Sequence, residues 1–178
     1  ILIIDPCINP DGRDRYANFF RMTSNQIPNV DPTTRSHKEP WPGGRTNHYY
    51  HDLNRDWCWQ SQKETKSRIK LYKKWMPHVH VDYHEQSYND PYYFAPAVQP
   101  YHSLITTWQK DFQKIIGDNN VKYFDNNHLL YFRNEDFDLL YPGFGDTYPI
   151  FNGALGMTYE KGGSGSGGIA VKTSASDT

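Results

Sequence analysis

The segment His-Val-His-Val-Asp-Tyr-His, residues 78–84, alternates polar side chains with apolar ones. This period of two predicts a half-buried β-strand. Side chains at every second position of a strand share a face, so His78, His80, Asp82 and His84 are expected to point the same way. Neighbours on that face are about 6–7 Å apart, too far for one metal ion to bind all of them. We expect His84 to be the ligand if a metal binds, because it stands where the strand gives way to a polar loop; histidines without a metal remain the alternative.

Two helical patterns and two further apolar runs surround this strand. Residues 60–75 and 101–117 carry apolar side chains at helical spacing, and Gly117 is expected to end the second helix. The apolar run at residues 1–5 predicts a buried strand, and residues 154–160 predict another. Because strands alternate with helices, we expect an α/β fold with a mixed, largely parallel sheet flanked by helices.

Three segments have the composition of turns or loops rather than of helices or strands. Asn9-Pro10-Asp11-Gly12 predicts a turn, because proline presets φ and glycine permits a positive φ. Residues 24–47 are rich in proline and polar side chains, which predicts a long irregular segment; such loops are usually functional or disordered. Residues 162–168 are all glycine or serine and predict a flexible stretch.

Length, charge and cysteine content exclude several classes of protein. The chain has 178 residues and a formal net charge of -1, and domains typically run to roughly 100–200 residues. Without a broad basic field, neither nucleic acid nor a membrane surface is an expected partner. No run approaches the ~18 apolar residues of a membrane span. Cys7 and Cys58 do not make a disulfide framework; a single bridge and two unrelated thiols both remain open.

Asn54 and Arg55 form a pair that can hold a carboxylate. The arginine supplies a bidentate fork and the asparagine a neutral donor. A salt bridge from Arg55 to Asp52 or Asp56 fits the same residues, so the pair alone does not decide between binding and structure.

Two other groups could carry chemistry. His48 and His51 have the spacing of a metal-binding pair, but their segment does not have a helical pattern. Glu160 ends an apolar strand and is followed closely by glycines, where a carboxylate could act as a general base or could simply be a charged strand end.

These pieces occur in one order along nearly the whole chain. The order is Asn9-Pro10-Asp11-Gly12, Gly44-Arg45, Asp52-Leu53-Asn54-Arg55, Asp82-Tyr83-His84, Tyr141 and Glu160. The ordered set resembles the zinc metallocarboxypeptidase family, of which pancreatic carboxypeptidase A is the familiar member. Two stretches of the sequence most resemble large bacterial members of the family. They are Trp-Pro-Gly-Gly-Arg-Thr-Asn-His at 41–48 and His-Glu-Gln-Ser-Tyr-Asn at 84–89.

The resemblance implies a role for each matching residue that touches metal or substrate. His84 is similar to the third zinc ligand of the family. Asn54 and Arg55 are similar to the pair that grips the free C-terminal carboxylate of the substrate. Arg45 is similar to the arginine that stabilises the oxyanion, and Arg21 is the alternative for that role.

The remaining matches concern the catalytic base and the specificity pocket. Glu160 resembles the general base that activates the zinc-bound water, and Tyr141 resembles the mobile tyrosine that closes over substrate. Asp146 stands fourteen residues before Glu160, which suits the family's pattern. In that register Gly145 falls near the floor of the specificity pocket and supplies no charge there.

The resemblance therefore implies a zinc-dependent metallopeptidase that hydrolyses the C-terminal peptide bond of peptides or proteins. A related zinc hydrolase acting on other amide or acyl substrates, and a non-catalytic peptide-binding relative, are the alternatives. Most relatives act outside the cytoplasm, so a secreted or periplasmic location is expected.

The family's first two zinc ligands come from a His-x-x-Glu that precedes the Asn-Pro-Asp-Gly motif by some distance. Here only eight residues precede that motif. Since catalytic zinc sites use three protein ligands, we expect residues 1–178 to be a partial catalytic domain that lacks the segment with these ligands and is inactive by itself.

Overall fold

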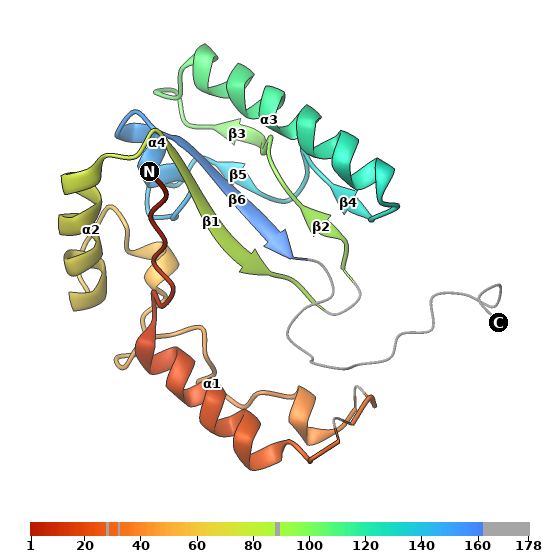
Figure 1. The fold of residues 1–178 in the computed structure, drawn as a ribbon. Helices are drawn as coiled ribbons and strands as arrows, with labels where there is room; N and C mark the ends of the chain where they lie inside the picture. The colour runs from red at the N-terminus through yellow and green to blue at the C-terminus, as the bar shows by residue number, and fades with distance from the viewer. Residues whose placement is uncertain (28, 32, 88–89, 162–178) are drawn as a thin grey trace.

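Two long parallel strands form the centre of the fold. The computed structural model describes residues 1–27, 29–31, 33–87 and 90–161. Strand β1 (Val79–Glu85) pairs in parallel with β6 (Leu155–Lys161), and the register places His84 opposite Glu160. This arrangement confirms the strands expected at 78–84 and 154–160 and brings two candidate functional residues to one end of the sheet (Figure 1).

Shorter strands complete two small sheets. The larger has the order β1-β6-β2-β4, in which β2 (Tyr92–Tyr93) runs antiparallel to β6 and β4 (Tyr131–Phe132) runs parallel to β2. The smaller pairs β3 (Val98–Tyr101) in parallel with β5 (Asp138–Leu139). The fold is thus α/β with a mixed, largely parallel sheet, as expected.

Helices cover both faces of the β1–β6 pair. The longer ones are α1 (Pro10–Thr23), α2 (Lys63–Trp75) and α3 (Thr107–Asn126), and the shorter ones are α4 (Thr147–Phe151) and two 3-10 turns at Arg35–His37 and Leu53–Arg55. On one face, Tyr72 of α2 and Trp57 pack edge-on against the His80 ring. On the other, Ile116 of α3 packs with Leu155 and Met157. Helix α1 lies apart from the sheet, beyond the carboxyl ends of β1 and β6 (Figure 1).

The apolar run at residues 1–5 does not form the expected buried strand. Ile1 is 111% exposed and Leu2 is 84% exposed, and no described strand pairs with this segment. A strand needs a neighbour for its backbone N–H and C=O groups, and apolar content alone does not supply one. The expectation of a buried strand was therefore wrong for the described structure.

The Asn-Pro-Asp-Gly motif begins a helix rather than forming a turn. Asn9 is the N-cap of α1, its side chain accepts a hydrogen bond from the Gly12 N–H, and Pro10 is the first helical residue. This is the position that proline tolerates best in a helix, since its missing N–H would have no partner there. The motif has the same residue preferences as a turn, which explains the error.

The second helix is displaced from the expected range of 101–117. It begins at Thr107, because Tyr101 pairs in β3 and Thr106 forms a capping box with Gln109. It also continues through Gly117, which does not end it. A Cβ on Gly117 would lie 2.2 Å from the Ala95 carbonyl oxygen, so this glycine permits close packing of α3 instead.

The remaining expectations from the sequence concern one helix and two connecting segments. The helix expected at 60–75 is present as α2. Within the described part of residues 24–47, the only regular element is one 3-10 turn. Residues 162–168 lie outside the described residues. Across the described ranges, every helix is too short or too polar to cross a membrane.

Candidate active site

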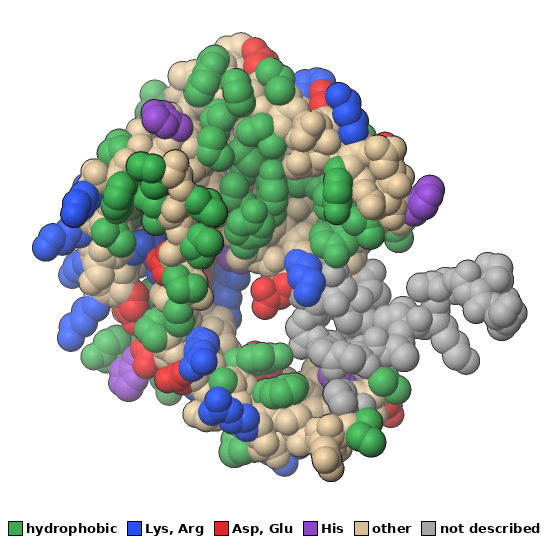
Figure 2. Space-filling view, in the orientation of Figure 1, with side chains coloured by type: hydrophobic (Ala, Val, Ile, Leu, Met, Phe, Trp, Pro, Cys, Tyr) green, Lys and Arg blue, Asp and Glu red, His purple; other side chains and the backbone are tan. Residues whose placement is uncertain are grey.

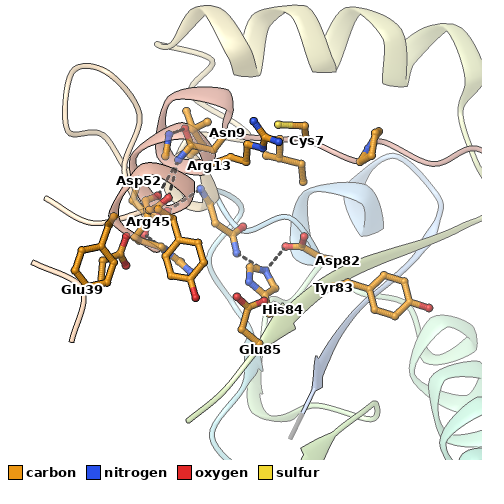
Figure 3. A pocket seen from close by; sticks show the side chains of 18 of the residues that line it. Cys7, Asn9, Arg13, Glu39, Arg45, Asp52, Asp82, Tyr83, His84 and Glu85 are labelled. Atoms are coloured by element: carbon orange, nitrogen blue, oxygen red, sulfur yellow. Dashed lines mark hydrogen bonds and ion pairs between the residues drawn. The ribbon is translucent and has the colours of Figure 1, made fainter. Parts of the chain in front are cut away.

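An open cavity of about 640 Å³ lies between α1 and the carboxyl end of β1. Its wall on the sheet side includes Asp82 and His84, and its opposite wall includes Asn9 and Arg45. Figure 2 shows the molecule hollowed between these two parts, and Figure 3 shows the side chains that face each other across the space. The position agrees with the rule that sites in α/β sheets gather at the carboxyl ends of strands.

Asp82 holds His84 in one orientation, and Asn54 lies against the same ring nitrogen. The Nε2 of His84 lies 2.8 Å from Asp82 Oδ2 and 3.1 Å from Asn54 Nδ2. Burial lowers the pKa of His84, but the hydrogen bond and negative charge of Asp82 raise it by more, so the net pKa lies above the ordinary value. A carboxylate on one ring nitrogen leaves Nδ1 as the nitrogen that can serve a metal, which is the common arrangement of metal-binding histidines.

Asn54 connects His84 to the loop that follows Tyr141. Its Oδ1 accepts a hydrogen bond of 2.6 Å from the Gly145 N–H, which leaves Nδ2 facing His84. Gly145 itself packs tightly, because a Cβ there would lie 2.3 Å from Asp82 Oδ2. Any larger residue at 145 would push against the carboxylate that orients His84.

Glu160 stands beside His84 on the neighbouring strand. It is 8% exposed, and its Oε2 is buried with no hydrogen-bond partner among the described residues. Burial raises the pKa of the Glu160 carboxyl, and the positive charge of His84 opposes this rise. A buried polar atom without a hydrogen-bond partner is costly to stability.

Arg45 reaches the cavity from the loop opposite β1. Its Nε donates a 3.0 Å hydrogen bond to Asp52 Oδ2, and its side chain is 51% exposed. The two Nη groups make no hydrogen bond within the described part of the chain, so they remain able to bind an anion. Arg21, the alternative oxyanion residue, lies in the last turn of α1 and does not line the cavity.

Arg55 and Tyr141 lie together but do not line this cavity. The Arg55 guanidinium sits 4.5 Å over the Phe144 ring and 3.8 Å from Asp52, which is the salt bridge that the sequence left open. The Tyr141 hydroxyl donates to the Arg55 carbonyl at 3.1 Å and accepts from Trp59 Nε1 at 2.6 Å. Of the proposed carboxylate pair, only Asn54 faces His84 in this structure.

The other residues considered from the sequence are a histidine pair and the two cysteines, of which Cys7 lines the cavity. His48 and His51 are both exposed and do not line the cavity. Cys7 and Cys58 are free thiols.

Two residues of the site received no specific role from the sequence. Asp82 orients His84, and its signal was its position two residues earlier on the same strand face. Asn9 donates a hydrogen bond to the loop that carries Arg45. The sequence feature that could have indicated this residue is an asparagine directly before a proline at the start of a helix.

The described residues match a zinc site only in part. His84 with Asp82 has the chemistry of one oriented ligand. However, within the described ranges no group of three or more His, Cys, Asp or Glu side chains is arranged to hold a metal ion. A catalytic zinc needs about three protein ligands, so these residues do not make a complete zinc site.

The fold of the chain is carboxypeptidase-like. It is similar to that of a metallo-carboxypeptidase from Burkholderia cenocepacia, with a TM-score of 0.52, 17% identity, and coverage of 76% of this chain and 35% of that chain. A provisionally named carboxypeptidase from Burkholderia mallei ATCC 23344 has a TM-score of 0.48 and 16% identity at the same coverages. The sequence matches no protein-family model and no curated protein. The chain thus spans about a third of the length of the solved structures to which it is similar.

Proposed function

We propose that this chain is the part of a zinc-dependent metallo-carboxypeptidase that supplies the catalytic base, one zinc ligand and the substrate-binding groups. The observation that carries the proposal is the pairing of a buried Glu160, whose Oε2 has no hydrogen-bond partner among the described residues, with an oriented His84 at one end of two adjacent strands. The carboxypeptidase-like fold supports it. The other ligands of the zinc would come from outside the described residues.

The zinc, when bound, would polarise the scissile carbonyl and acidify a bound water. Glu160 would accept a proton from the attacking water, for which its raised pKa and buried position suit it. It would then pass the proton to the amine of the leaving residue. Asp82 would keep His84 in the tautomer that presents Nδ1.

Arg45 would stabilise the negative charge that develops on the carbonyl oxygen. Its Nε is held by Asp52 and the residue lines the open cavity, so its charge would be in place before the reaction. Asn54 would contribute to binding the terminal carboxylate of the substrate. This role requires its Nδ2 to leave His84, and Arg55 to turn from Phe144.

A pair of peptides that differ only at the C-terminus tests the substrate class. The full-length protein should release the last residue from the free acid at least about 100-fold faster than from the amide, because charge-assisted hydrogen bonds to the carboxylate contribute roughly 1.5–3 kcal/mol each. Both rates are measured by mass spectrometry of the shortened peptide. Equal rates for the two peptides would reject a grip on the terminal carboxylate, and no release from either would reject the proposed activity.

A further inference from the structure

Asn9 links helix α1 to the loop that carries Arg45. Its Oδ1 accepts a 3.0 Å hydrogen bond from the Gly12 N–H, which caps the helix. Its Nδ2 donates to the carbonyl oxygens of Gly44 and Arg45, each at 3.2 Å. One amide side chain therefore uses its oxygen for the helix and its nitrogen for the loop.

Gly12 makes the same contact possible from the helix side. A Cβ on Gly12 would lie 2.1 Å from the Gly44 carbonyl oxygen and 2.4 Å from Asn9 Nδ2. The loop thus sits against the first turn of α1 at a distance that only glycine permits. Asn9 and Gly12 belong to the same four-residue motif, and both act on the same loop.

Other contacts hold the two residues that follow Arg45 and the side chain of Arg45 itself. Arg15 of α1 donates to the carbonyl oxygens of Thr46 and Asn47, the latter at 3.0 Å. Asp52 accepts from the Arg45 side chain at 3.0 Å. The main chain of Arg45 is therefore fixed through Asn9, and its side chain is fixed through Asp52.

We infer that Asn9 is a positioning residue, which holds the main chain of Arg45 so that its guanidinium faces the reacting carbonyl across the cavity. The inference rests on the proposed function for its catalytic part. Its structural part, the attachment of residues 44–45 to α1, stands on the hydrogen bonds alone. Asn9 itself is on the wall of the cavity opposite His84 and is not required to touch the substrate.

The substitution Asn9→Asp separates helix capping from loop attachment. Aspartate caps a helix about as well as asparagine, so α1 should remain intact. Its carboxylate has no N–H for the carbonyls of Gly44 and Arg45, so the loop should be released. Asn9→Ala removes both functions, and Asn119→Asp, the same change at an exposed site on α3, is the matched control.

Hydrogen–deuterium exchange of the full-length protein gives the first readout. We expect residues 42–47 to exchange faster in Asn9→Asp while α1 is unchanged, and both regions to exchange faster in Asn9→Ala. Unchanged exchange of residues 42–47 in Asn9→Asp would overturn the inference. This readout does not depend on any activity, so it decides the attachment even if the proposed function fails.

Steady-state kinetics give the second readout. Asn9→Asp should lower kcat at least about 10-fold with KM changed less than about twofold, since small displacements of a group that acts only in the transition state reduce kcat. In an Arg45→Ala background the same substitution should have no further effect. An equal fall of kcat with and without Arg45 would overturn the inference, and a wild-type protein that releases no C-terminal residue would refute the proposed function instead.

Discussion

Glu160→Gln is expected to lower kcat of the full-length protein about 1,000-fold, the middle of the roughly 100–10,000-fold range for loss of a general base. Glutamine has nearly the same shape, but it cannot take a proton from water. The position is buried, and Oε2 already lacks a hydrogen-bond partner among the described residues, so the substitution breaks no hydrogen bond there. Turnover of a free-acid peptide and zinc content by elemental analysis are the two measurements.

The zinc content of Glu160→Gln should remain that of the wild type, because Glu160 is assigned to the proton and not to the metal. Glu135→Gln makes the same chemical change at an exposed loop position and serves as the control. A Glu160→Gln protein with near-normal turnover would remove Glu160 from the mechanism. Loss of zinc in this variant would instead assign the carboxylate to the metal.

His84→Ala should abolish both zinc binding and turnover in the full-length protein. Replacing residues that merely orient a metal ligand typically weakens metal affinity about 10–100-fold, so loss of the ligand itself should exceed this. Asp82→Asn should fall within that smaller range, because it loosens the His84 ring without removing it. Zinc dissociation constants from competition with a chelator would rank the three proteins.

The control for His84→Ala is His48→Ala. His48 is exposed and lies outside the cavity, so its removal should leave zinc affinity and turnover unchanged. Loss of zinc in His48→Ala would favour the alternative pair of His48 and His51. Retention of zinc in His84→Ala would exclude His84 as a ligand.

The helices and strands that could be predicted from the sequence were those in which the spacing of apolar side chains indicates the type of element. The patterns of β1, β6 and α2 predicted the type of each element. In β1, however, the more buried face carries His80, Asp82 and His84, while Val79 and Tyr83 are exposed. The run at residues 1–5 failed because burial of a strand depends on a partner, which composition does not reveal. α3 began late because Thr106 supplied a capping box inside an otherwise helical pattern.

The position of a candidate residue was predictable from the sequence where a strand carries it, and less so where a connecting segment carries it. His84 and Glu160 follow from the ends of two strands, and their opposition follows from the register. Arg55 and Tyr141 stand on connecting segments, and their contacts with Phe144 and Trp59 depend on how those segments meet. Asn9 was read as part of a turn because a turn and a helix start favour the same residues.

The most direct test of the central claim is the metal dependence of C-terminal release by the full-length protein. One peptide with a free C-terminus is incubated with the protein as isolated, after metal removal by a chelator, and after addition of zinc, and the products are weighed by mass spectrometry. A metallo-carboxypeptidase predicts loss of the last residue, arrest after metal removal and recovery with zinc. Cleavage at internal bonds, or release that continues without metal, would contradict the account.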